Sequence, residues 1–242
     1  MRLWDFKVGY DRLYQDYHRL TINDPVYTSM QVYKHSERIP EPVEGEVLHQ
    51  MDYVPDRTNG FENALMQRHT WPYPFPNEQT IDLPLIARFT QLAFIGHERE
   101  GRAYPSGGAR YYVRIHLLFN ENRVEESLGR WNVCQVDADR GLLAGRKSVP
   151  WSRIEQAYIQ KESAATAQFA IALTADLDSI AAKYPDISYK LVQQEAGHIG
   201  QNIQLVANYL GIRSLPLGGF YDAPLGTIIG TGDDVLYSFL LG

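Results

Sequence analysis

The order of short apolar segments between residues 59 and 242 restricts the fold more than any other feature of this sequence. Some segments repeat apolar residues every three or four positions, and others alternate them with polar residues. This pattern predicts helices over residues 61–67, 83–95, 151–160, 176–184 and 188–210, and strands over 112–119, 131–136, 169–173, 212–217 and 235–241. Since strands and helices are interspersed without a regular βαβ repeat, the sequence indicates an α+β fold.

The first 57 residues differ from the rest of the chain. Five apolar or aromatic residues recur there at helical spacing, namely Leu3, Phe6, Tyr10, Leu13 and Tyr17. The polar segment 21–55 follows, and its prolines disfavour helix. We therefore expect an N-terminal helix and extended arm over residues 1–57 and one further domain over residues 58–242.

Composition excludes several classes of protein. The one cysteine, Cys134, cannot form an internal disulfide or a cysteine-rich metal site. Net charge is −6 without a long basic run, which argues against a nucleic-acid partner. No apolar run approaches the ~18 residues of a membrane span, and the N-terminus shows no secretory signal. We expect a cytoplasmic protein with no metal and no membrane partner.

Two paired-glycine turns are the first candidate ligand-binding elements. One occupies residues 104–108 before a predicted strand, and the other occupies 217–222 after one. Adjacent glycines let a ligand approach the backbone and meet its N–H groups. Neither turn matches the Rossmann or P-loop fingerprint, and the first is explained equally well as an ordinary turn before a strand.

Charged and polar residues at helix ends are the second group of candidates. Arg68 can form a bidentate contact with phosphate, and a lysine next to a tyrosine, as in Lys183-Tyr184, can transfer a proton if burial lowers the lysine pKa. His198 on the long helix is a rival base. The alternatives are solvated helix ends for the first two and a packed histidine for the third.

Taken in order, these motifs resemble the SagB-type branch of the nitroreductase superfamily. They are PSGG at 105–108, KY at 183–184, YK at 189–190, EAGH at 195–198, QN at 201–202 and GGF-x-D at 218–222. That branch contains FMN-dependent dehydrogenases that oxidise thiazolines and oxazolines to thiazoles and oxazoles, in ribosomal peptide precursors or nonribosomal intermediates. The similarity covers most of the chain, and the N-terminal segments 17–21 and 33–40 resemble the leader segment of the family.

The resemblance implies a nitroreductase-like fold, in which helices flank an antiparallel-rich central sheet, and an intertwined homodimer with FMN at its interface. The implied FMN contacts are Arg68, His69 and Thr70 at the phosphate or ribityl chain, Pro105, Ser106, Gly107 and Gly108 along the isoalloxazine, Gly218 and Gly219 through backbone N–H near N5 and O4, and Gln201 and Asn202 on the dimer helix. Lys183 and Tyr184 match the pair implicated in azoline oxidation.

The sequence also departs from the family pattern. Gln67 replaces the first arginine of the phosphate element, Lys190 replaces an arginine, and residues 109–112 differ from the usual run. The chain ends soon after its last strand, so we expect it to lack the C-terminal basic phosphate ligand of simple nitroreductases. These changes leave fewer groups to hold the phosphate.

Azoline oxidation needs a base and a hydride acceptor. A base removes the proton next to the ring nitrogen, a hydride passes to flavin N5, and O2 reoxidises the flavin. Lys183 and Tyr184 are the expected base system, on a substrate borne by a peptide or a carrier protein, with a cyclodehydratase or nonribosomal synthetase as a further partner. The alternatives are a generic NAD(P)H-dependent nitroreductase and a non-enzymatic docking scaffold.

Overall fold

The computed structural model describes residues 13–26, 54–71, 74–76, 79–96, 101–184 and 187–242. Most of the expected N-terminal helix and arm, residues 1–12 and 27–53, lies outside these residues. The helices are α1 (Leu13–Thr21), α3 (Gly60–Gln67), α4 (Leu83–Thr90), α5 (Glu126–Gly129), α6 (Trp151–Ile154), α7 (Lys161–Thr166), α8 (Leu177–Ala181), α9 (Ser188–Tyr209) and α10 (Asp222–Ile229). The strands are β1 (Arg114–Phe119), β2 (Val133–Asp137), β3 (Leu142–Lys147), β4 (Phe169–Ala175), β5 (Ser214–Leu217) and β6 (Asp234–Leu241).

The strands of the described chain form one sheet in the order β3-β2-β1-β4-β6-β5. Every neighbouring pair is antiparallel; β1 and β4, for example, pair from Arg114 opposite Thr174 to Phe119 opposite Phe169. The expected α+β fold with an antiparallel sheet flanked by helices is confirmed.

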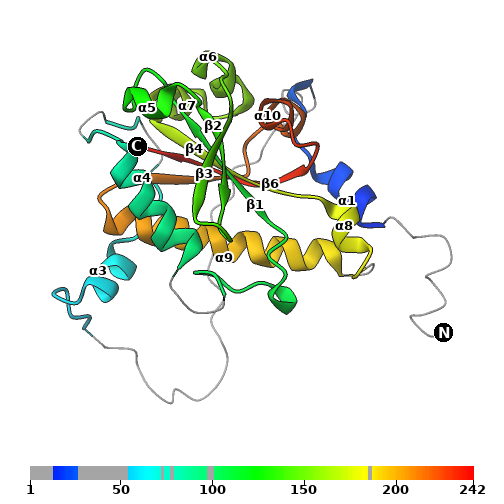
Figure 1. The fold of residues 1–242 in the computed structure, drawn as a ribbon, viewed down its shortest axis with the longest axis horizontal. Coiled ribbons are helices and arrows are strands. Elements are labelled where there is room, and N and C mark those ends of the chain that lie inside the picture. The colour runs from blue at the N-terminus through cyan, green and yellow to red at the C-terminus, as the bar shows by residue number, and fades with distance from the viewer. Residues whose placement is uncertain (1–12, 27–53, 72–73, 77–78, 97–100, 185–186) are drawn as a thin grey trace, which may run out of the picture.

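Helices cover both faces of this sheet (Figure 1). All seven residues of β4 are buried, and they alternate between two cores. Phe169, Ile171 and Leu173 pack in the core that contains residues of α4 and α9. Ala170 and Ala172 pack in the core that contains residues of α6, α7 and α10. β4 therefore belongs to both cores.

The 22-residue helix α9 approaches the sheet through small residues. A Cβ on Gly200 would stand 2.9 Å from Phe239 Cζ, so a glycine is needed for this close contact. The apolar residues that recur at helical spacing in this segment, Leu191, Ile199, Ile203, Val206 and Leu210, give the face expected from the sequence. Ile199 and Ile203 are buried, together with Val192, Ala196, Gly200 and Ala207. Val206 and Leu210 are half-buried against the same core, and Leu191 is half-buried next to Gly107.

Local signals predicted two further helices in part. The helix over 83–95 is α4 followed by a π-helical turn (Gln91–Ile95), and the Asp82 side chain caps it by accepting the Leu85 N–H at 2.8 Å. The helix expected over 151–160 is shorter: α6 and a 3-10 turn (Glu155–Ala157) end before Tyr158, which is extended and forms a β-bridge with Phe220. α5, α7 and β3 were not expected.

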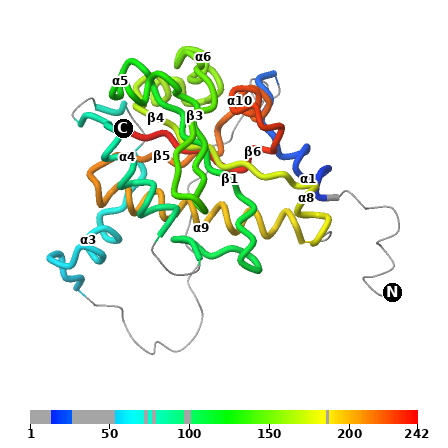
Figure 2. Tube along the Cα trace, in the orientation of Figure 1, coloured from blue at the N-terminus to red at the C-terminus, as the bar shows by residue number. Residues whose placement is uncertain are grey.

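Figure 2 traces the chain from the end of α9 through a turn into β5. Gly211 in that turn has φ +74°, as its predicted role at the helix end requires. Within the described ranges, no helix reaches the length and hydropathy that crossing a bilayer requires. The His, Cys, Asp and Glu residues of the same ranges form no group of three suited to a metal ion.

Candidate functional site

A buried carboxylate on α9 anchors the glycine turn that precedes β1. Ser106 Oγ donates a 2.5 Å hydrogen bond to Glu195 Oε2, and the Val113 N–H donates to Glu195 Oε1 at 3.1 Å. Ser106 Oγ also accepts from the Tyr111 N–H at 2.9 Å. Glu195 is only 2% exposed. The Ser106 hydroxyl, expected beside the flavin, is thus engaged with α9.

This turn holds an uncommon backbone conformation. Gly108, Ala109 and Tyr111 have φ values of +64°, +52° and +53°. For a residue other than glycine, the left-handed conformation costs roughly 1–2 kcal/mol. Such conformations persist where surrounding contacts enforce them, commonly at binding and catalytic sites. Here Glu195 and Ser106 supply those contacts.

The turn also meets the expected proton-transfer pair. A Cβ added to Gly108 would stand 3.0 Å from Tyr184 Oη, so the glycine leaves room for the hydroxyl. Lys183 Nζ lies 5.2 Å from the centre of the Tyr184 ring. Lys183 is exposed and Tyr184 half-buried. Gly108 and Tyr184, which are far apart in sequence, therefore lie together.

Two further predicted residues of α9 contact the first glycine turn or the segments before it. His198 Nδ1 is 3.3 Å from the Pro105 carbonyl oxygen. Asn202 Nδ2 donates to the carbonyl oxygens of Ala93 and Ala103, at 3.1 and 2.9 Å, so it joins the segments before the turn. Gln201 is exposed.

The second glycine turn offers an open backbone surface. Gly218 is exposed, and a Cβ there would have no atom within 4 Å. Gly219 is enclosed: a Cβ would stand 2.7 Å from Gln160 Nε2, and its carbonyl oxygen accepts from the Ile159 N–H at 2.9 Å. Gly218 can thus be approached by a flat ring, while Gly219 packs against the segment that precedes α7.

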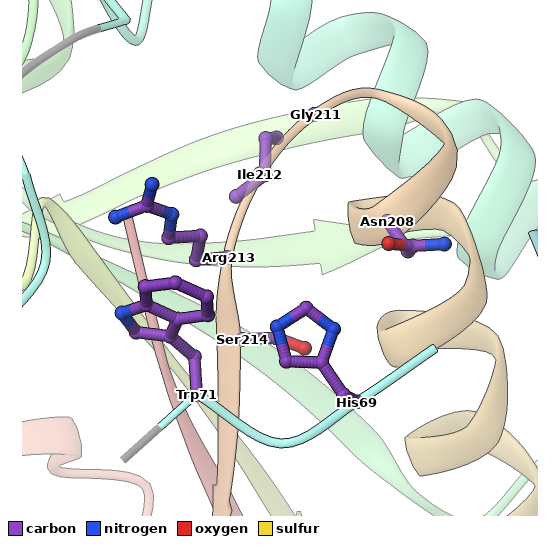
Figure 3. A pocket seen from close by; sticks show the side chains of 7 residues that line it. All are labelled: His69, Trp71, Asn208, Gly211, Ile212, Arg213 and Ser214. Carbon is purple, nitrogen blue, oxygen red and sulfur yellow. The ribbon is translucent and has the colours of Figure 1, made fainter. Parts of the chain in front are cut away.

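A cavity of about 100 Å³ lies between residues 69–71 and the start of β5 (Figure 3). The backbone N–H of Trp71 donates to the Ser214 carbonyl oxygen at 3.0 Å, and the Arg213 guanidinium lies 3.9 Å from the centre of the Trp71 ring. The cavity has room for about three waters at ~30 Å³ each, or for one group of phosphate size. Its lining residues are His69, Trp71, Asn208, Gly211, Ile212, Arg213 and Ser214.

Of the three residues predicted to hold the phosphate, only one lines this cavity. His69 lines it, whereas Arg68 Nη1 donates to Gln204 Oε1 on α9 at 3.0 Å and Thr70 is exposed. Sequence reasoning missed Arg213 and Trp71. The available signal was a lone arginine in the otherwise apolar run that leads into β5.

The donors at the cavity fit the phosphate end of FMN. Arg213 and His69 suit an anion, and Trp71 Nε1 is a buried donor without a hydrogen-bond partner among the described residues. The cavity is too small for the isoalloxazine, since drug-sized ligands occupy ~300 Å³ or more. Arg213 directly precedes β5 and Gly218 directly follows it, so the cavity and the second glycine turn lie at opposite ends of one strand.

Arg102 adds charge to the start of the first glycine turn. Its guanidinium contacts Asp139 Oδ1 at 2.8 Å and donates to Tyr104 Oη at 3.0 Å. Burial raises the pKa of Tyr104, and the Arg102 bond opposes part of that rise. Tyr104 is therefore a protonated structural residue at neutral pH.

Comparison with known proteins places the chain in a family. The family model described as "Nitroreductase family" matches residues 65–242. A Methanocaldococcus jannaschii protein named "Putative nitroreductase MJ1384" is 24% identical over 133 residues, which are 54% of this chain and 65% of that protein. The match thus spans slightly less than two thirds of that relative's length.

Solved structures share the fold. One chain of the E. coli microcin synthetase McbBCD complex, solved with truncated pro-MccB17 bound, has a TM-score of 0.76 at 17% identity, covering 96% of this chain and 92% of that chain. A Desulfovibrio desulfuricans protein solved in complex with FMN has a TM-score of 0.52 at 14% identity, covering 76% and 86%. FMN, the expected cofactor, is thus bound by a protein of this fold. With the family model covering most of the chain and the sheet and helices agreeing, the chain belongs to the nitroreductase family.

Proposed function

We propose that this protein is an FMN-dependent dehydrogenase that oxidises thiazoline or oxazoline rings in a peptide or carrier-bound intermediate. The observation that supports this proposal most directly is the close approach of the Tyr184 hydroxyl to Gly108, in a turn that Glu195 anchors. The fold match to a chain of a microcin synthetase complex over nearly the whole length supports the same proposal.

FMN would be held at three places. Arg213, His69 and Trp71 would take the phosphate end, the exposed backbone at Gly218 would face the ring, and the turn at 105–108 would line it. When bound, FMN supplies the acceptor for two electrons and one hydrogen of the azoline.

The protein's own residues would remove the other hydrogen as a proton. Tyr184 Oη would stand 3.0 Å from a Cβ on Gly108, and Lys183 Nζ lies 5.2 Å from the centre of the Tyr184 ring, so this pair is placed beside the glycine turn to accept the proton. A base held in this geometry contributes typically ~10²–10⁴-fold to the rate. Positioning of the azoline between Tyr184 and the ring adds to that effect.

A homodimer is part of the proposal. The cavity beside Arg213 cannot enclose the isoalloxazine, and Gly218 is exposed, so a second copy would cover the ring. Sedimentation of the yellow protein tests this point, and a monomer that retains both flavin and activity would contradict it.

The catalytic assignment is tested with Lys183→Ala and Tyr184→Phe. Both variants should bind FMN but oxidise a thiazoline peptide or thioester ~10²–10⁴-fold more slowly, because the base is lost. The matched control is Tyr209→Phe, an exposed tyrosine at the far end of α9. Wild-type rates in both yellow test variants would refute the assignment.

A second candidate is a nitroreductase that takes its electrons from NAD(P)H, and the M. jannaschii relative named "Putative nitroreductase MJ1384" favours this class of activity. Two assays separate the candidates. An azoline dehydrogenase bleaches its flavin with a thiazoline under anaerobic conditions and recovers colour with O2. Steady NADPH turnover with a nitroaromatic, without bleaching by a thiazoline, would favour the nitroreductase.

A further inference from the structure

The segment that follows α1 contacts the second glycine turn directly. Asn23 Nδ2 donates to the Gly218 carbonyl oxygen at 2.7 Å, and the Asn23 N–H donates to Asp222 Oδ2 at 2.7 Å. One residue thus contacts both ends of the turn between β5 and α10. In Figure 1 the segment after α1 runs towards α10.

The Asn23 contact sets the direction of a peptide group. The Gly218 carbonyl and the Gly219 N–H belong to one planar trans peptide, so they point in opposite directions. Glycines on both sides make rotation of this peptide easy. Because the next carbonyl, that of Gly219, is held by Ile159, Asn23 supplies the contact that fixes the remaining freedom.

α1 itself is anchored on both sides of the Lys183–Tyr184 turn. On α8, Tyr14 Oη and Gln15 Nε2 donate to Asp178 Oδ1 at 2.8 and 2.5 Å. At the start of α9, His18 Nδ1 lies 3.4 Å from Tyr189 Oη. His18, 8% exposed, also places Nε2 3.3 Å from Asp234 Oδ1 on β6.

We propose that α1 and Asn23 form a positioning strap, which holds the Gly218–Gly219 peptide in the orientation that the flavin needs and in register with the Lys183–Tyr184 turn. Asn23 and His18 are positioning residues, since they act through Gly218 and Tyr189. This inference rests on the proposed function, because it assumes that the Gly218 turn faces FMN. It gives the N-terminal part of the chain a role in the site.

The first test measures FMN binding and the flavin absorption spectrum. Asn23→Ala removes the bond to Gly218 and frees the peptide to rotate, so the Kd for FMN should rise about 2–10-fold, the range of one hydrogen bond. The visible band should shift and the flavin should become harder to reduce, because a donor near the ring is lost. Asn23→Asp should have a larger effect, since its carboxylate repels the Gly218 carbonyl. Asn122→Ala, an exposed asparagine after β1, is the matched control and should change nothing.

The second test separates the two ends of the strap. His18→Ala should lower the rate of azoline oxidation by roughly tenfold or more through misplacement of the base, with a smaller change in the Kd for FMN than Asn23→Ala causes. Melting curves of each variant show that it is folded.

The outcomes distinguish the two proposals. A yellow wild type whose Asn23→Ala and Asn23→Asp variants keep its Kd and spectrum would overturn the strap alone. A wild type that cannot be loaded with FMN would overturn the proposed function and, with it, the strap.

Discussion

The hydrogen bond from Ser106 to Glu195 should contribute strongly to stability, and Ser106→Ala isolates it. The substitution removes the hydroxyl that donates to Glu195 Oε2 and accepts from the Tyr111 N–H. Glu195 is nearly inaccessible to solvent, so water cannot replace the lost donor without opening the turn. The cavity left by one hydroxyl is small and adds little.

The magnitude follows from these contacts. Hydrogen bonds to charged groups contribute about 1.5–3 kcal/mol, and an abandoned buried partner costs a similar amount. Tyr111 is half-buried, so its N–H can be hydrated in part. We expect the free energy of unfolding to fall by about 2–3 kcal/mol. At ~2–4 °C per kcal/mol for a chain of this size, Tm falls by roughly 4–12 °C.

Ser179→Ala is a close control for this measurement. Ser179 Oγ donates to Asp176 Oδ2, also at 2.5 Å, but on an exposed helix start. Water replaces that bond readily, so the loss should stay below about 1 kcal/mol. Calorimetry of the three proteins at pH 7 provides the comparison. Equal melting temperatures for the two variants would refute the idea that burial at Glu195 makes its bond strong.

Two further predictions concern the scaffold. Gly200→Ala places a methyl group against Phe239 and should be about 1–3 kcal/mol less stable than Gly197→Ala on the same helix, where a Cβ meets nothing within 4 Å; denaturant melts that order the two variants the other way would contradict the packing of α9. His116 is 1% exposed, with Nε2 3.0 Å from Thr174 Oγ1, and burial lowers its pKa to about 4. Because this folded-state pKa lies below the unfolded value of 6.5, the stability that neutral His116 provides is complete above pH 6.5 and is lost as pH falls towards 4. The free energy of unfolding of the wild type should therefore fall by up to about 3 kcal/mol more than that of His116→Gln between pH 6.5 and 4; parallel pH profiles of the two proteins would contradict this prediction.

Much of the fold was readable from local patterns. The uninterrupted apolar run 169–173 predicted the central strand, and Gly211 marked the end of the longest helix, because burial and helix termination leave direct traces in sequence. β3 was missed because its residues are mostly exposed, and its place is set by backbone pairing with β2. A strand held by its neighbour's backbone carries no alternation of its own.

The candidate site was predicted in its parts but not in its connections. The motifs identified the two glycine turns and the Lys183–Tyr184 pair, yet nothing local indicated that Gly108 meets Tyr184. Glu195 on a helix resembles a solvated residue until the Ser106 and Val113 donors are seen around it. Such contacts depend on distant segments, which a one-dimensional pattern does not report.

Because β4 belongs to both cores, it affects how the protein unfolds. Its odd-numbered residues support the layer of α9, and Ala170 and Ala172 support the layer of α6 and α10. Neither layer can separate without exposing the strand that the other needs, so the scaffold should melt cooperatively, in a single transition. A destabilising change in the layer of α6 and α10 would therefore shorten the working lifetime of the α9 layer, which anchors the first glycine turn, even without touching it.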